Sequence, residues 1–115
     1  MQFKLIMAFV KPVITDDVVD AMKEAGATGA TIIPARGTGI HEAKSFFGLS
    51  IENQTDIIVF LVEEHVVENL MAVIRLAGKF DKPGTGIAFV LPVEHIAGLE
   101  SQMKKFKDQA RDQYF

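Results

Sequence analysis

Two glycine-rich segments of the chain could bind an anion. Residues 37–39 and residues 84–86 both read Gly-Thr-Gly; the first follows a short apolar run and the second precedes one. Glycine adopts backbone angles that are closed to other residues and leaves its amide N–H uncovered, so such a loop can approach an anion closely. The same composition also suits an ordinary turn, so the neighbouring elements have to decide between the two interpretations.

Four strands are expected to position these segments. The predicted strands are residues 3–10, 31–35, 56–62 and 87–91, and Pro92 is expected to close the last. The evidence is their alternation and their content of β-branched and aromatic residues. Three of the four are apolar on both faces. Helices can cover only one face, so we expect the other face to meet another subunit. A ring of three copies satisfies this pattern, although alternation alone does not separate a dimer from a trimer.

Two helices are expected between these strands. Thr15 is a predicted N-cap and Gly26 a predicted stop for the first, and apolar spacing over residues 66–77 predicts a second that ends at Gly78. A final helix is expected between residues 99 and 112. The order βαββαβ predicts an α+β, ferredoxin-like fold, with a four-stranded antiparallel sheet and both helices on one face.

Composition narrows the class of protein. The chain has 115 residues, which suggests one domain at 1–96 with a helical tail at 97–115, and it has no cysteine for disulfides or thiolate metal sites. A net charge of -3 argues against a general nucleic-acid binder. The longest apolar run, 57–62, is too short for a membrane span, and no secretory pattern opens the chain, so we expect a cytoplasmic protein.

Several short motifs in the expected order resemble the PII signal-transduction family, the nitrogen regulatory proteins P-II. The resemblance covers residues 3–96 and rests on Phe3-Lys4-Leu5-Ile6, Lys11-Pro12, Asp16-Asp17-Val18, Gly26-Ala27-Thr28-Gly29-Ala30-Thr31, Gly37-Thr38-Gly39, Gly84-Thr85-Gly86 and Phe89-Val90-Leu91-Pro92-Val93-Glu94. It implies a homotrimer that regulates other proteins and is not an enzyme. It also implies that an adenine nucleotide (AMP, ADP or ATP) acts as effector in each cleft between subunits, with no cofactor required.

The resemblance also implies where an effector and a target protein would bind. The implied nucleotide contacts are Phe9, Thr31, Arg36, Gly37, Thr38, Gly39, His41, Phe60, Lys82, Gly84, Thr85 and Gly86. A long T-loop at residues 40–55 would dock onto a transporter, an enzyme or a transcription regulator. Exposed aromatic residues commonly mark docking surfaces, so Phe46, Phe47 and Leu49 are candidate anchors, unless they pack back onto the domain itself. The loop has no tyrosine, so uridylylation is not expected.

This chain departs from the family pattern at positions that would bind phosphate. The family's glutamine after the first glycine segment is replaced by His41, and its T-loop lysine by Gln54 or Thr55. Its aspartate and lysine in the second glycine loop are replaced by Thr85 and Ile87. Its two arginines after the last strand are replaced by Gly98 and Glu100. Each charge-assisted contact is worth on the order of 1.5–3 kcal/mol, so their loss should weaken a triphosphate more than a monophosphate. Arg36, Lys44, Lys79 and Lys82 are the cations that could compensate.

Two other classes of function stay open at this point. A metal-responsive trimer, similar to divalent-cation-tolerance or metal-efflux accessory proteins, would use histidines, but His41, His65 and His95 lack ligand spacing, so no metal site is predicted. An enzyme of the same fold, such as an acyl-phosphate hydrolase, would need an arginine in residues 11–16, where there is none. No catalytic residue is therefore predicted.

Overall fold

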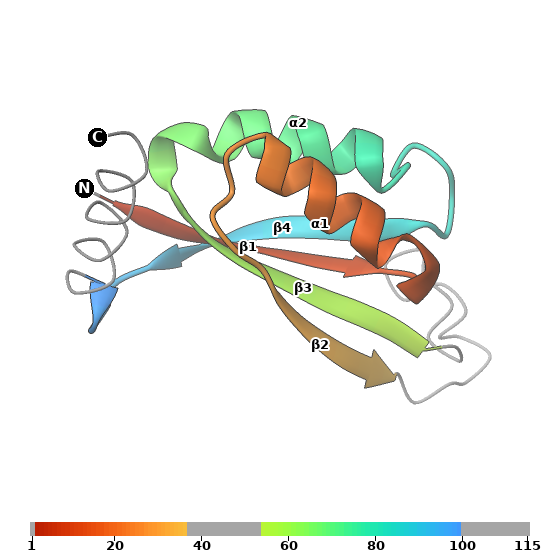
Figure 1. Ribbon diagram of the computed structural model, residues 1–115, viewed down its shortest axis with the longest axis horizontal. Helices are drawn as coiled ribbons and strands as arrows, with labels where there is room; N and C mark the ends of the chain where they lie inside the picture. The colour runs from red at the N-terminus through yellow and green to blue at the C-terminus, as the bar shows by residue number, and fades with distance from the viewer. Residues whose placement is uncertain (1, 37–53, 100–115) are drawn as a thin grey trace, which may run out of the picture.

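The computed structural model describes residues 2–36 and 54–99. Its elements are, in chain order, β1 (Phe3–Val10), η1 (Pro12–Ile14), α1 (Thr15–Glu24), β2 (Thr31–Arg36), β3 (Gln54–Glu63), η3 (Glu64–Val66), α2 (Val67–Ala77) and β4 (Gly86–Val93). The strands form one antiparallel four-stranded sheet in the order β2-β3-β1-β4, and both helices lie on the same side of it (Figure 1). The predicted ferredoxin-like fold is confirmed. All but the first residue of the expected final helix and all but the end of the expected T-loop lie outside the described residues.

Every second side chain of the central strands lies in the core. Ile6 and Ala8 of β1 are fully buried, and their partners across the ladder, Phe60 and Ile58 of β3, are also fully buried. Residues that face each other in an antiparallel pair point to the same side of the sheet. The helices pack on this side through further fully buried residues, Val18, Met22, Leu70 and Ile74. This covered face is the domain's hydrophobic core.

The alternate side chains of the same strands form an open face. Leu5, Met7 and Phe9 of β1 are directly opposite apolar residues of β3 and β4. Among the described residues no helix packs on this side, and Leu61 and Leu91 keep 39% and 41% of their surface exposed. The sequence prediction of a sheet that is apolar on both faces but covered on one is therefore confirmed.

Both prolines of the sheet lie in its edge strands. The prediction that Pro92 closes the last strand is wrong, because β4 continues to Val93 and Pro92 pairs with Lys4. Pro34 likewise sits inside β2, opposite Asp56. Proline lacks the amide that a central strand must donate, but an edge strand has one side without a partner and tolerates it.

The helix boundaries differ from the prediction at their N-terminal ends, since α2 also begins one residue later than expected, at Val67. Thr15 is not the N-cap of α1: a 3₁₀ turn over Pro12–Ile14 precedes the helix, Ile14 takes the capping position, and no side chain caps it. The Thr15 hydroxyl instead donates to Asp56 Oδ2 at 2.6 Å. Gly26, at φ +112°, follows the end of α1 as predicted, and Gly78 follows the last residue of α2.

Candidate functional site

The connection between α2 and β4 is held together by its own polar groups. The hydroxyl of Thr85 donates its one hydrogen between two carbonyl oxygens, that of Lys79 at 2.7 Å and that of Lys82 at 2.9 Å. The Lys82 amide also donates to the Lys79 carbonyl, at 3.0 Å. Lys79 and Gly84 adopt positive φ values of 56° and 78°. Because the amides of Lys79, Phe80 and Lys82 already donate to carbonyl oxygens, an anion bound here would meet chiefly the exposed side chains of Lys79 and Lys82.

The end of this loop is tightly packed against β1. A Cβ atom placed on Gly86 would lie 2.6 Å from the Phe9 carbonyl oxygen and 2.7 Å from the Phe80 ring, and one on Gly78 would lie 2.3 Å from the same ring. Phe80 therefore occupies the space that two glycines leave. Gly86 is one of the nucleotide contacts that the resemblance implies, whereas Phe80 was not predicted from the sequence. The spacing of Phe80 between Gly78 and the second glycine segment was the signal that could have revealed it.

Phe9 lies next to this loop on the open face of the sheet. Its ring stacks on that of Phe89, with the centroids 5.8 Å apart and the planes 27° apart. Both rings are half-buried. The pair is a partly exposed aromatic surface beside Gly86. Phe9 and Gly86 are thus two predicted site residues that the fold brings together.

Phe60 is a wrong assignment. Its side chain is fully buried on the covered face of β3, in the core beneath the helices. A nucleotide could reach it only by displacing a helix. The error follows from the two-residue period of a strand: Val59 and Leu61, its neighbours in the chain, are on the open face, and Phe60 is not.

The other described site residues lie on the opposite edge of the sheet. Thr31 and Arg36 begin and end β2, and both are exposed. The strand order places β3 and β1 between β2 and β4, a separation of three strand spacings, or about 14 Å. One copy of the chain therefore keeps Thr31 and Arg36 apart from the 79–86 loop. The predicted residues Gly37, Thr38, Gly39 and His41, and the docking residues Phe46, Phe47 and Leu49, lie outside the described residues.

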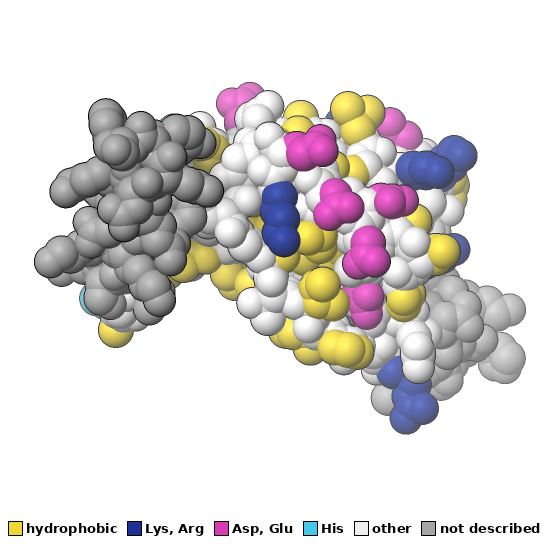
Figure 2. Space-filling view, viewed as in Figure 1, with side chains coloured by type: hydrophobic (Ala, Val, Ile, Leu, Met, Phe, Trp, Pro, Cys, Tyr) yellow, Lys and Arg dark blue, Asp and Glu magenta, His cyan; other side chains and the backbone are white. Residues whose placement is uncertain are grey.

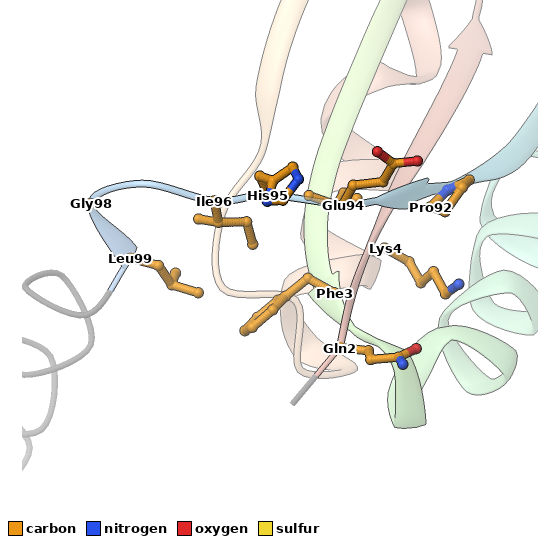
Figure 3. A pocket seen from close by; sticks show the side chains of 10 residues that line it. Gln2, Phe3, Lys4, Pro92, Glu94, His95, Ile96, Gly98 and Leu99 are labelled. Carbon is orange, nitrogen blue, oxygen red and sulfur yellow. The ribbon is translucent and has the colours of Figure 1, made fainter.

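A hollow lies at the far end of β4, away from the 79–86 loop. In Figure 3 the side chains of Phe3, Ile96 and Leu99 point toward the space between them, at the junction of β1 and the chain that leaves β4. Gly98, one of the positions where the family has an arginine, also lines it and adopts φ +91°. An arginine would be strained in that conformation. Seven residue-to-residue steps along β4 lead from Gly86 to Val93, about 23 Å of strand, so this hollow and the glycine loop are distinct places on one copy.

The charges of the described residues are unevenly placed. Acidic side chains gather over α1, where Asp16, Asp17, Asp20 and Glu24 are exposed (Figure 2). This face would repel a polyanion. Of the histidines, His65 lies 3.3 Å from the Glu63 carboxylate and His95 lines the hollow. Within residues 2–36 and 54–99, no three acidic or histidine side chains are grouped as a metal site would need.

Comparison with known proteins identifies the family. The model of the nitrogen regulatory protein P-II family matches residues 3–102. The chain belongs to the PII family. Proteins of this family are regulatory signal transducers, so the protein is a regulator and not an enzyme.

Individual relatives agree with this assignment. The chain is 29% identical to nitrogen regulatory protein P-II of Azospirillum brasilense, covering 88% of this chain and 95% of the relative. It is 28% identical to that of Mesorhizobium japonicum, covering 85% and 92%. The crystal structure of Arabidopsis thaliana PII bound to citrate has the same fold, with a TM-score of 0.63 at 23% identity over 81% of this chain and 78% of that one. Among the described residues, no helix is long and apolar enough to span a membrane.

Proposed function

We propose that this PII-family protein is a cytoplasmic homotrimer that binds an adenine nucleotide in the clefts between its subunits. The residues between Arg36 and Gln54 would then bind a target protein and pass on the effect of the nucleotide. From the family resemblance we expect this target to be a transporter, an enzyme or a regulator. The observation that carries this proposal is the distribution of the candidate site residues over opposite edges of one sheet.

The open face of the sheet supports the assembly. Large apolar side chains from all four strands lie side by side there, and Leu61, Leu91 and Ile33 each remain 39–44% exposed. Contiguous apolar surfaces of this kind are rare on monomers and mark interfaces. A second copy packed on this face would bury them, and a ring of three copies buries one such face per subunit.

The separation of the site residues supports a cleft between copies. Thr31 and Arg36 lie on the β2 edge, whereas Phe9, Gly86 and the lysines of the 79–86 loop lie toward the β4 edge. A cleft where the β2 edge of one copy meets the β4 edge of the next would bring the two groups together. The Phe9–Phe89 pair, on the open face, would then lie beside the joint.

The described cations favour a ligand with few phosphates. Lys79 and Lys82 are the lysines of the glycine loop, Gly98 stands where the family has an arginine, and the Thr85 hydroxyl is bonded to loop carbonyls. A cation that contacts a phosphate contributes on the order of 1.5–3 kcal/mol. With fewer such contacts, we propose that AMP or ADP binds at least as tightly as ATP.

Two measurements test this proposal: light scattering on the protein as it elutes from a size-exclusion column, and calorimetric titration with AMP, ADP and ATP. We expect a mass of three chains and measurable heat from AMP or ADP. Lys82→Ala should weaken binding roughly ten-fold because it removes one charge-assisted contact. Lys23→Ala, a change of the same kind on the exposed face of α1, should leave the affinity unchanged.

The possible failures point to different parts of the proposal. A trimer that gives no heat with any of the three nucleotides would refute nucleotide binding and leave the assembly intact. Nucleotide binding to a monomer would refute the cleft between copies. ATP binding much tighter than AMP binding would contradict the assignment of the ligand by its phosphate number.

A further inference from the structure

One row of paired residues crosses the whole sheet near the 79–86 loop, which is the candidate ligand loop. Gly86 of β4 lies opposite Val10 of β1, Val10 lies opposite Asp56 of β3, and Asp56 lies opposite Pro34 of β2. Gly86 is the first residue of β4, and Asp56 is close to the start of β3 at Gln54. Val10 is therefore a direct neighbour both of the candidate ligand loop and of the point where the chain from residues 37–53 joins the sheet.

Two side-chain hydrogen bonds reinforce this row on the β3 side. Thr55 Oγ1 donates to the Val10 carbonyl oxygen at 2.9 Å, and Thr15 Oγ1 donates to Asp56 Oδ2 at 2.6 Å. Thr15, at the start of α1, is only 4% exposed, so water competes little for its hydroxyl. A short bond from a hydroxyl to a carboxylate is among the stronger hydrogen bonds in proteins. The first residues of β3 are thus bonded to the end of β1 and to the start of α1.

The β2 side of the same junction has no such reinforcement. Arg36, the last residue of β2, pairs with Gln54 across the ladder and is exposed. β2 is an edge strand, and Pro34 within it has no amide to donate. Within the described residues, β2 side chains make no hydrogen bond. The two strands that flank residues 37–53 are therefore held unequally.

We propose that Thr15, Thr55 and Asp56 are positioning residues that fix the entry of the chain into β3 and tie it, through Val10, to the loop at residues 79–86. The three residues together are called the β3 clamp below. A ligand that contacts Gly86 and a target that contacts the segment before Gln54 then act on the same residue, Val10. The regulatory part of this inference rests on the proposed function, whereas the clamp itself is a property of the unliganded chain.

Hydrogen exchange of the full-length protein without ligand tests the clamp. Thr15→Val removes the donor and keeps the shape of the side chain. We therefore expect amide exchange to rise about ten-fold over residues 54–57, and with it over residues 33–36, which pair with them, while β4 changes little. Thr15→Ser keeps the hydroxyl and should behave like the wild type. Thr28→Val, at an exposed threonine, is the matched control and should change neither segment.

A second variant separates a positioning role from a general stabilising one. Thr55→Val removes the other bond without touching α1, and it should raise exchange over residues 54–57 in the same way. If Thr15→Val and Thr55→Val raise exchange equally in all four strands, or leave residues 54–57 unchanged, the clamp is refuted. If Thr15→Val does not fold, Thr55→Val alone decides the question.

Repeating the exchange with ADP tests the connection to the ligand loop. In the wild type, ADP should slow exchange over residues 54–57, and Thr55→Val should remove most of this effect. An ADP effect that is the same in Thr55→Val as in the wild type would overturn the connection through Val10. A wild type that binds no ADP would overturn both the nucleotide function and this connection, while the exchange of the unliganded protein would still decide the clamp.

Discussion

The two faces of the sheet are built from the same kinds of side chain but have opposite surroundings. On the covered face Ile6, Ile58 and Phe60 are fully buried beneath the helices. On the open face their chain neighbours Leu5, Val59 and Leu61 are equally apolar but keep part of their surface exposed. Alternation decides which residues share a face, but the connections between strands decide which face the helices cover. An apolar face that the connections leave open is available to another copy of the chain.

The largest expected difference is between phenylalanines on the two faces. Phe60→Ala should lower the free energy of unfolding by about 3–5 kcal/mol, because it leaves a cavity in the core. Phe89→Ala, on the open face, should lower it by less than half as much in the dissociated subunit, because the ring is already partly exposed there. Denaturant unfolding of both variants measures this difference. Equal losses in the dissociated subunit would contradict the distinction between the faces.

A charge on the open face should act on assembly and not on folding. Leu61→Asp replaces a leucine that is 39% exposed, so each subunit would lose about 0.6–1.2 kcal/mol of apolar burial at the proposed interface and would have to bury a carboxylate there. We expect the trimer to dissociate into folded monomers, as measured by light scattering and circular dichroism. Leu76→Asp, at a leucine that is 75% exposed on α2, is the control and should leave the mass unchanged. A variant Leu61→Asp that stays trimeric would exclude this face as the interface.

The fold could be predicted from the sequence because its elements repeat with regular periods. The alternation in β1 and β3 and the apolar spacing of α2 are local patterns, and the structure confirms all of them. The errors arose where a local preference met a tertiary contact. Thr15 is a good N-cap by type, but its hydroxyl bonds to Asp56, which is distant in the chain. Pro92 looks like a strand end, but an edge strand accommodates it.

The candidate site could be predicted less well, because its residues come from both edges of the sheet. Motif spacing found the 79–86 loop, and the fold does place Phe9 beside Gly86. Motif spacing could not show that the Thr85 hydroxyl is bonded to the loop's own carbonyls. Nor could it show which way a strand residue points, which is how Phe60 was wrongly assigned to the site. Direction and register are set by pairing between strands, which no single segment records.

A smaller loss of stability is expected from adding a methyl group at Gly86, where the 79–86 loop meets β1 and no room is left. Gly86→Ala would place a Cβ atom 2.6 Å from the Phe9 carbonyl, so we expect a loss of about 1–3 kcal/mol in stability. Gly29→Ala meets nothing within 4 Å and should be neutral or slightly stabilising, since it restricts the unfolded chain. Thermal unfolding of the two variants makes the comparison. If Gly86→Ala were as stable as Gly29→Ala, the packing of Phe80 and β1 around this glycine would have to be looser than its contacts indicate.

The smallest effect is expected at the rim of the covered face, where the core meets water. Lys4 points to the helix side of β1 but lies at its end, 3.9 Å from the Glu64 carboxylate, with side chains 25% and 55% exposed. A pair this open contributes at most about 0.5–1 kcal/mol. Glu64→Gln should therefore shift the denaturation midpoint barely more than Glu68→Gln, an exposed acidic residue of α2. A larger loss, reduced by added salt, would show that charge as well as apolar burial holds the helices to this face.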